Sequence, residues 1–345
     1  MKVGNVSQTV LKRSVLKQLH TKREEILSTP SEEEMCTVLC TNPKEDVVTT
    51  SATVFGNSKS VGVYAVLKAV LDLETRGASA IGVSIQVILP SHAYESRLKE
   101  MVRQMEDICA KMNVEITCAK AEVSPAVSQS LVTVSAIGTV GKKQVISCKN
   151  IKPNQDIVLC GCIGLEGMLR ILDEEENELA HRFIPTFIKQ MKNLKEQIFI
   201  HEAVCMAQPY VTGMQQIGAG GVFAALWELT QASQLGLKID MQKLTICQET
   251  VEVCEYYHLN PYQMTSTGSV LMVTENGTQL VQILNEMGIK ASLIGVTTAE
   301  NAKVITSGEE IRYLDKPQPD ELMIWWERKK EQSMKEGNYE SGNRD

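Results

Sequence analysis

Three loops rich in glycine and other small residues are the segments of this sequence best suited to hold a ligand. They cover Gly161–Gly167, Gly218–Gly221 and Ser266–Ser269, and helices are predicted directly after the first two. Glycine lets backbone N–H groups point inward at a helix N-terminus, which favours anions such as phosphate. The alternative is that small residues only let a helix pack closely on a strand. None of the loops is a P-loop or a GxGxxG motif. Together they predict an anion-binding cleft lined by Gly161, Gly164, Gly167, Gly220, Gly221, Ser266 and Gly268.

The elements of the first half are predicted to form a mixed α+β layer. Apolar residues recur at helical spacing over Val6–Leu19, Val61–Arg76 and Tyr94–Met112. Strands are predicted over Met35–Leu39, Val47–Thr50, Ile81–Leu89, Val114–Val123 and Leu131–Thr139. The order β-α-β-α-β-β is typical of a mixed α+β sheet layer.

A polar segment with a proline, Ile151–Gln155, marks the predicted boundary between two domains. We expect an N-terminal domain over residues 1–150 and a C-terminal α/β domain over residues 151–326. Its strands are predicted over Asp156–Cys160, Val270–Thr274, Ala291–Thr298 and Ala302–Thr306. Its helices are predicted over Phe183–Met191, Glu202–Met206, Val222–Gln234, Glu249–Tyr257 and Gly277–Met287. Residues 327–345 have almost no apolar side chains and are predicted to form a disordered tail.

The composition indicates a globular, cytoplasmic protein. Its 345 residues fit two domains, and 43% hydrophobic residues supply two cores. A net charge of −7 argues against a nucleic-acid partner. The sequence has no apolar run of the ~18 residues that a membrane span needs. The segment Met1–His20 is too polar for a signal peptide.

The cysteines and histidines show no spacing typical of a metal or catalytic site. The ten cysteines are scattered without a CxxC pair, as expected of free thiols in a reducing compartment. Cys205 lies in an apolar run and is interpreted as a small hydrophobic residue. The five histidines, His201 among them, are dispersed along the chain. We therefore interpret them as surface or hydrogen-bonded interior residues and predict no structural metal site.

The order of the three loops resembles the C-terminal domain of the aminoimidazole ribonucleotide (AIR) synthase, or PurM-like, superfamily. The matching segments are Asp156–Gly167, Glu174–Phe183, Val211–Met214, Gly220–Glu228, Gln248–Glu252, Leu259–Tyr262 and Ser266–Ser269. The superfamily includes thiamine-monophosphate kinase, selenophosphate synthetase and the hydrogenase-maturation carbamoyl dehydratase. Within it, the sequence is most similar to the AIR-synthase-related group that resembles this dehydratase. The resemblance covers roughly residues 1–325 and is weaker in the first half.

This resemblance implies a two-domain α+β architecture and a shared chemistry. ATP phosphorylates an amide, formyl or other oxygen, or donates phosphate directly, and Mg²⁺ bridges its phosphates. Members are typically homodimers that pair through their N-terminal sheets, with the nucleotide in a cleft near the domain junction. The implied ligand of this chain is therefore a purine nucleotide or a phosphorylated metabolite.

The sequence departs from the family at most positions that hold metal and phosphate. A Gly-Glu-Asp-Ala-like motif is matched only by Ser31–Glu34, and a Thr-Asp pair aligns with Thr50-Ser51. An Asn-Asp pair aligns with Leu71-Asp72, which keeps the acid. The Gly-Gly-His-Thr-Glu signature aligns with Cys118–Glu122, which keeps the glutamate. The His-Asp-x-Thr-Glu-Gly-Gly signature aligns with Gln215–Gly221, where the glycines remain.

Five other residues remain as candidates for the site. Asp72 and Glu122 are the candidate Mg²⁺ ligands, because Mg²⁺ usually takes one or two carboxylates. Lys120 can place a point charge beside a phosphate, and Gln215 and Gln216 can hydrogen-bond a neutral ligand. Each candidate also has an alternative interpretation. Asp72 can be an ordinary polar residue on a half-buried helix, and Glu122 and Lys120 can be solvated strand residues. The two glutamines can be remnants of the motif.

Three functions fit these residues. The first is a protein that binds a nucleotide or phosphorylated metabolite with weak or lost ATP turnover. The second is an active ATP/Mg²⁺-dependent enzyme with a reorganised site built on Asp72, Glu122 and Lys120. The third is a non-catalytic dimeric scaffold or regulatory partner. If nucleotide binding depends on magnesium, the second function is favoured. If the nucleotide binds without magnesium, the first function is favoured.

Overall fold

The computed structural model describes residues 4–5, 7–26, 39 and 42–342, and the chain forms two compact units. Unit 1 comprises Met1–Ser147 and Phe199–Met214, and unit 2 comprises Cys148–Ile198 and Gln215–Asp345. The first change of unit lies close to the predicted boundary after residue 150. The return of Phe199–Met214 to unit 1 had no sequence signal. Most of the predicted strand Met35–Leu39, and the motif Ser31–Glu34, lie outside the described residues.

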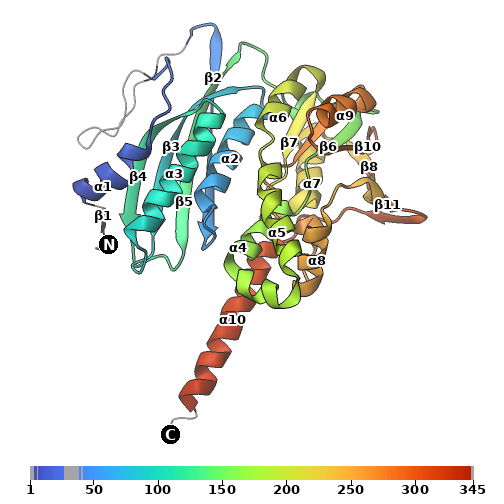
Figure 1. Ribbon diagram of the computed structural model, residues 1–345. Coiled ribbons are helices and arrows are strands. Elements are labelled where there is room, and N and C mark those ends of the chain that lie inside the picture. Colours follow the sequence, from blue (N-terminus) through green and yellow to red (C-terminus); the bar gives the residue numbers. More distant parts are fainter. Residues whose placement is uncertain (1–3, 6, 27–38, 40–41, 343–345) are drawn as a thin grey trace. The chain divides into compact units, whose positions relative to one another are not determined.

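The sheet of unit 1 has five strands in the order β1-β4-β3-β5-β2. They are β1 (Gly4–Asn5), β2 (Glu45–Gly56), β3 (Ser79–Leu89), β4 (Glu115–Val123) and β5 (Ser130–Gly141). Strands β3 and β4 run parallel, as expected for two strands joined through helix α3 (Glu95–Lys111), and the other pairs are antiparallel. Figure 1 shows α2 (Val61–Glu74) and α3 side by side over this sheet. We call the side of the sheet under these helices the helix face and the other side the open face.

Helix α2 is buried on nearly all its sides, because it packs against the sheet, α3 and the short helix α6 (His201–Ala207). Val61, Tyr64 and Leu67 are all fully buried. The chain leaves the helix at Gly77, whose φ of +77° suits a residue without a side chain. The sequence predicted this end. Helix α1 (Gln8–Ser14) is shorter than the predicted helix over Val6–Leu19.

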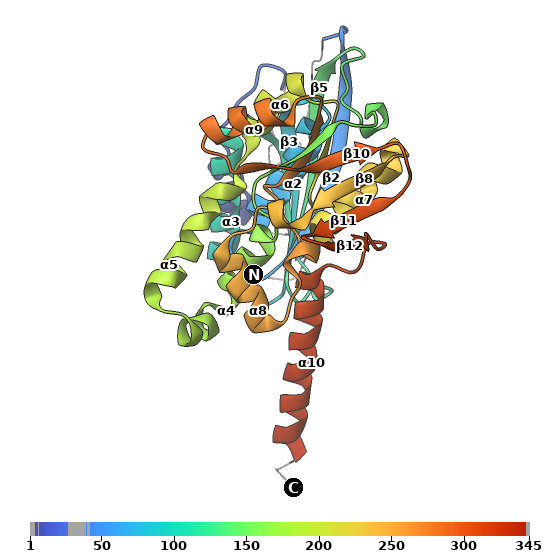
Figure 2. The ribbon, with the colours of Figure 1, turned by 90° about the vertical axis from the view of Figure 1, so that its right-hand side faces the viewer.

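The sheet of unit 2 has seven strands in the order β12-β11-β8-β10-β6-β9-β7. They are β6 (Asp156–Cys160), β7 (Gly213–Gln216), β8 (Gly236–Asp240), β9 (Val270–Thr274), β10 (Ala291–Thr298), β11 (Lys303–Ser307) and β12 (Glu310–Tyr313). Figure 2 shows β10, β8, β11 and β12 in this order. The inner strands β6 and β9 consist mainly of buried apolar residues, which is typical of strands covered on both faces.

Helix α7 (Gly221–Ser233) packs on this sheet around a core that includes Ile157, Leu159, Leu226 and Leu271, and α9 (Gly277–Glu286) contacts β6 and β10. The other helices of unit 2 include α4 (Leu165–Arg182), α5 (Pro185–Asn193), α8 (Gln248–Tyr257) and α10 (Glu321–Gly342). The two mixed sheets and their helices confirm the predicted α+β fold with two domains. Strands β1, β7, β8 and β12 were not predicted, because each is short and lacks an alternating pattern.

The segment after Trp326 differs from the predicted disordered tail. Helix α10 continues through it to Gly342, and Figures 1 and 2 show it extending away from the other helices of unit 2. Glu, Lys and Gln form helices well without a buried apolar face, which explains the difference. Among the described residues, none of the helices has the length and apolar character needed to cross a membrane.

Candidate functional site

Asp72, a predicted metal ligand, lies on α2 above the helix face of unit 1. Its Oδ2 is 3.5 Å from Oγ1 of Thr50 on β2. Thr50 points to the helices because it alternates with the exposed Thr49 and Ser51, in step with the buried Ala52. Asp72 is half-buried. It therefore occupies a polar position between a helix and the edge strand of the sheet.

Lys120 and Glu122 lie on β4 and point to the open face. They alternate with Ala119 and Ala121, which are buried under the helices. Lys120 is exposed, and Glu122 is half-buried opposite Asn5 of β1. The sheet separates both side chains from Asp72. Unit 1 thus brings Lys120 and Glu122 onto one face and does not bring Asp72 to them.

A hollow of about 410 Å³ in unit 1 lies at Thr50 and Ser51. Hydroxyl side chains dominate its lining, which consists of Thr49, Thr50, Ser51, Ser84, Thr117, Ser135, Ala136 and Ile137. The hydroxyls of Ser135 and Ser51 are 3.3 Å apart. Hydroxyls donate and accept hydrogen bonds without carrying charge. The hollow can therefore bind polar groups, but its lining offers no carboxylate to a cation.

The glycine loops of unit 2 pack against each other. A Cβ on Gly161 would lie 2.4 Å from the carbonyl oxygen of Gly268, and a Cβ on Gly268 would lie 2.5 Å from the backbone of Ile198. Gly164 donates its N–H to Ser266 Oγ at 2.6 Å. These residues lie close together, and their backbones contact protein. The tight-packing interpretation therefore accounts for Gly161, Gly164, Ser266 and Gly268.

Two further glycines of the predicted cleft contact the segment before Thr265. A Cβ on Gly167 would lie 2.2 Å from Cγ of Met264, and a Cβ on Gly221 would lie 2.4 Å from the carbonyl oxygen of Tyr262. Both positions require glycine because helices α4 and α7 start against this segment. Close packing again explains the residue type.

A carboxylate of the protein itself, that of Asp320, lies at the start of α7. The N–H of Gly220 donates to Oδ2 of the buried Asp320 at 2.8 Å. A carboxylate is favourable there because a helix N-terminus attracts negative charge. Gln215 Nε2 donates to Glu228 Oε2 at 2.8 Å, and Gln216 is buried. Protein groups therefore hold several of the contacts that the sequence assigned to a ligand.

Glu166 ties these loops together from a fully buried position at the start of α4. Its carboxylate pairs with Arg170 at 2.9 Å and accepts hydrogen bonds from Thr265 Oγ1 at 2.6 Å and from the Thr267 N–H at 3.1 Å. A buried ion pair costs desolvation and needs such additional hydrogen bonds. This network fixes the loops, and sequence reasoning did not identify it.

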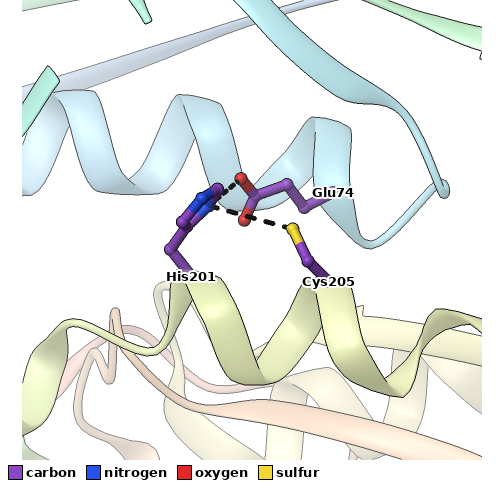
Figure 3. A group of neighbouring side chains, drawn as sticks. All are labelled: Glu74, His201 and Cys205. Atoms are coloured by element: carbon purple, nitrogen blue, oxygen red, sulfur yellow. Dashed lines mark hydrogen bonds and ion pairs between the residues drawn. The ribbon is translucent and has the colours of Figure 1, made fainter. Parts of the chain in front are cut away.

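A second cluster, in unit 1, joins Glu74 of α2 to His201 and Cys205 of α6. Figure 3 shows the three side chains pointing toward one another across the two helices. His201 Nδ1 is 2.5 Å from Glu74 Oε1 and 3.9 Å from Cys205 Sγ. Glu74 is completely buried, while the other two are partly buried. Oε2 of Glu74 has no hydrogen-bond partner among the described residues.

The environment of the cluster changes its protonation. Burial lowers the pKa of His201, but hydrogen bonds with Cys205 and Glu74 outweigh it and raise the pKa to about 10. Burial raises the pKa of the Glu74 carboxyl, and the contact with His201 opposes this shift. At neutral pH Nδ1 of His201 therefore carries a proton, which it donates in the short hydrogen bond to the Glu74 carboxylate.

The cluster lines a cavity of about 890 Å³ in unit 1. The ends of α2 and β5 and the segment Gln208-Pro209 contribute other parts of its wall. From the sequence alone, His201 and Cys205 are interpreted as structural residues. Their spacing of four residues on a helix was the only available signal, since Glu74 lies 127 residues from His201 in the sequence.

Comparison with protein-family models identifies both halves of the chain. Residues 33–140 match the N-terminal domain of AIR synthase related proteins, and residues 152–307 match the C-terminal domain. A protein of Methanocaldococcus jannaschii named as a hydrogenase expression/formation protein is 26% identical over 88% of this chain and 90% of its own length. The carbamoyl dehydratase HypE of Rhodobacter capsulatus is 22% identical over 70% of this chain and 71% of its own.

Solved structures share the fold. Escherichia coli HypE has a TM-score of 0.72 at 17% identity, covering 92% of this chain and 99% of that one. A structure of the hydrogenase maturation protein HypE in complex with ATP has a TM-score of 0.70 at 16% identity, covering 91% and 96%. At these identities the likeness establishes the architecture alone.

Proposed function

Because the chain belongs to the AIR synthase related family, we propose that it binds a purine nucleotide or another phosphorylated metabolite, with weak or lost ATP-dependent phosphoryl transfer. The observation that supports the loss of turnover most strongly is the position of the two surviving acids. Asp72 lies above the helix face, whereas Glu122 points to the open face.

Phosphoryl transfer depends on metal ions that bridge and neutralise the phosphates. Mg²⁺ takes oxygen ligands at about 2.0–2.1 Å, so two carboxylates that share one ion must approach each other closely. The sheet of unit 1 lies between Asp72 and Glu122. Lys120 lies near Glu122 and can attract a phosphate, but it brings no ligand for a cation. These positions argue against a reorganised magnesium site within unit 1.

Ligand binding without a metal is supported by the hollow of hydroxyl side chains in unit 1. Its Ser51 stands where the family carries an acid, so an anionic ligand there meets one carboxylate fewer. A structural relative, HypE, has been crystallised with ATP. Removing an acid weakens metal binding and, by the same electrostatics, reduces repulsion of a phosphate that arrives without metal.

We further propose that the protein is a cytoplasmic homodimer that pairs through its N-terminal sheets. Strand β2 presents Thr53 and Phe55 on the open face, and Phe55 is 39% exposed. We place the contact at Phe55, which lies outside the lining of the hydroxyl hollow. The cytoplasmic location is supported by the eight cysteines of the described part of the chain, which are free thiols, as expected in a reducing compartment. Sedimentation of the purified protein tests the dimer. Phe55→Glu should shift it to a monomer, and a wild-type monomer at micromolar concentration contradicts the proposal.

The test of ligand binding is a thermal-shift titration with ATP, ADP and AMP, each with and without magnesium. A ligand that binds only the folded protein at a hundred times its dissociation constant stabilises it by about 2.7 kcal/mol. We expect stabilisation by at least one nucleotide that persists when magnesium is omitted. Lys120→Ala should weaken it, and the matched surface variant Lys111→Ala should not.

Two outcomes would contradict this function. A shift that requires both ATP and magnesium and disappears in Asp72→Asn would indicate an active metal site. No shift with any nucleotide at millimolar concentration would exclude nucleotide binding and favour a scaffold or regulatory role.

A further inference from the structure

We propose that Glu74, His201 and Cys205 form a binding site for a divalent transition metal, and that Zn²⁺ is the ion that fits it best. The site lies wholly within unit 1, on two helices that pack against each other. It is independent of the nucleotide site proposed above.

The geometry has the convergence that a metal site requires. One ligand atom from each side chain lies within 4.8 Å of the other two. Around a tetrahedral Zn²⁺ with bonds of about 2.0–2.3 Å, neighbouring ligand atoms stand roughly 3.3–3.7 Å apart. The 3.9 Å from Cys205 Sγ to His201 Nδ1 is close to that spacing. The 2.5 Å contact between Glu74 and His201 must open by about 1 Å when an ion replaces the proton between them.

The same geometry argues against a nucleophilic triad. In such a triad the base accepts from the nucleophile through one ring nitrogen and contacts its carboxylate through the other. Here Glu74 and Cys205 both approach Nδ1 of His201. Three groups directed at one point are typical of ligands around an ion.

The ligand types select the metal. A thiolate, an imidazole and a carboxylate are all ligands that Zn²⁺ accepts. Mg²⁺ and Ca²⁺ prefer oxygen ligands only, so Cys205 and His201 exclude them. His201 and Cys205 are four residues apart on α6, which places both on one side of the helix.

The burial of Glu74 supplies an independent reason to expect a cation. Its carboxylate is completely buried, yet within the described part of the chain only Oε1 has a hydrogen-bond partner. A buried polar atom without a partner costs about 1–3 kcal/mol, and more when it is charged. Gln208 donates to the backbone oxygen of Glu74 at 3.1 Å and does not satisfy the carboxylate. A metal ion would supply the missing charge and contact.

The cavity provides room for a fourth ligand. Catalytic zinc sites have three protein ligands and one position for water or substrate. The cluster contributes three ligands and lines a cavity of about 890 Å³. Arg23 also lines the cavity, where its guanidinium donates hydrogen bonds to Glu25 and to the carbonyl oxygen of Asn113. We therefore infer an exchangeable water in the fourth position.

Cobalt binding tests the site in the full-length protein. After removal of metals with a chelator, titration with Co²⁺ should give a thiolate-to-cobalt charge-transfer band that saturates at one ion per chain. Zn²⁺ should then displace cobalt and abolish the band. Cys205→Ser should remove the band and lower zinc affinity at least roughly 100-fold, because loss of an outer-shell partner alone costs 10–100-fold.

Cys118→Ser is the matched control, since Cys118 is also a partly buried free cysteine of unit 1 but faces away from the cluster. It should keep the band and the stoichiometry. His201→Gln and Glu74→Gln should weaken zinc binding without removing the thiol. The absence of a charge-transfer band in the wild type, or an unchanged band in Cys205→Ser, would overturn the proposal. The wild-type measurement decides even where a variant fails to fold.

Discussion

The glycine loops of unit 2 and the Glu74 cluster of unit 1 contrast in how their polar groups are used. In the loops, protein groups fill the positions that a ligand would take: Asp320 holds the N–H of Gly220, and Ser266 holds that of Gly164. In the cluster, a buried carboxylate oxygen has no partner among the described residues, and a cavity adjoins it. Residue types that suggest a site in a sequence can therefore be used for packing, whereas an incomplete set of contacts indicates an available site.

The largest effect is expected for Glu166→Gln, which tests whether the buried network of Glu166 fixes the glycine loops. It removes the negative charge from the buried ion pair with Arg170, so we expect the free energy of unfolding to fall by about 3–5 kcal/mol in urea denaturation. Glu100→Gln is the matched control. Its partner Arg103 is half exposed, and water replaces the interaction there with little change in stability. A loss no greater in Glu166→Gln than in the control would show that the network does not fix the loops.

The next largest effect is expected for Gly268→Ala. Its φ of +90° disfavours a side chain, and the new Cβ would lie 2.5 Å from the Ile198 backbone, so we expect a loss of about 3 kcal/mol. Gly288→Ala shares a positive φ of +78° but meets no atom within 4 Å, and should cost about 1 kcal/mol. Equal losses in the two variants, measured by urea unfolding, would mean that Gly268 is not packed against protein.

A smaller effect is expected on anion binding at the N-terminus of α7. Asp320→Asn removes the charge beside the N–H of Gly220 while keeping an oxygen for Leu322. A charge near a helix N-terminus contributes about 0.3–1 kcal/mol, so pyrophosphate affinity should rise roughly 2- to 5-fold in calorimetric titration. Asp240→Asn, which alters a cap elsewhere in unit 2, is the control. Unchanged affinity in Asp320→Asn would show that Asp320 does not compete with a phosphate.

The smallest effect concerns acid stability in unit 1. Hydrogen bonds from Arg13 and Ser14 lower the pKa of Glu95 to about 2. A lowered pKa means that the contribution of Glu95 is complete above its ordinary pKa of 4.5 and is lost as the pH falls toward 2. Chemical denaturation from pH 6 to pH 2 should show a shallower decline for Glu95→Gln than for the wild type. Parallel declines would contradict this assignment.

Much of the fold followed from sequence patterns, because long periodic segments carry their own signal. Strands β6, β9 and β10 were predicted with their observed bounds, and helices α2 and α3 within two residues at each end. Short edge strands such as β12 have no apolar alternation and were missed. The run of charged residues in α10 was interpreted as disorder, because composition alone does not distinguish a solvated helix from a coil.

The candidate sites were harder to predict, because they depend on contacts between distant segments. The sequence indicated three small-residue loops in one domain but did not indicate that Asp320 would lie at Gly220. Alignment placed Asp72 and Glu122 in one site, while strand alternation places them on opposite sides of a sheet. His201 and Cys205 gain significance only when Glu74 packs against them, and no local pattern predicts that contact.

The most direct test of the contrast is a crystal structure of the full chain with equimolar zinc, measured at the zinc absorption edge. We expect the highest peak in the anomalous difference map to lie about 2.0–2.3 Å from atoms of Glu74, His201 and Cys205, with no peak at the glycine loops. A zinc peak elsewhere, with the hydrogen bond between Glu74 and His201 intact, would contradict the account.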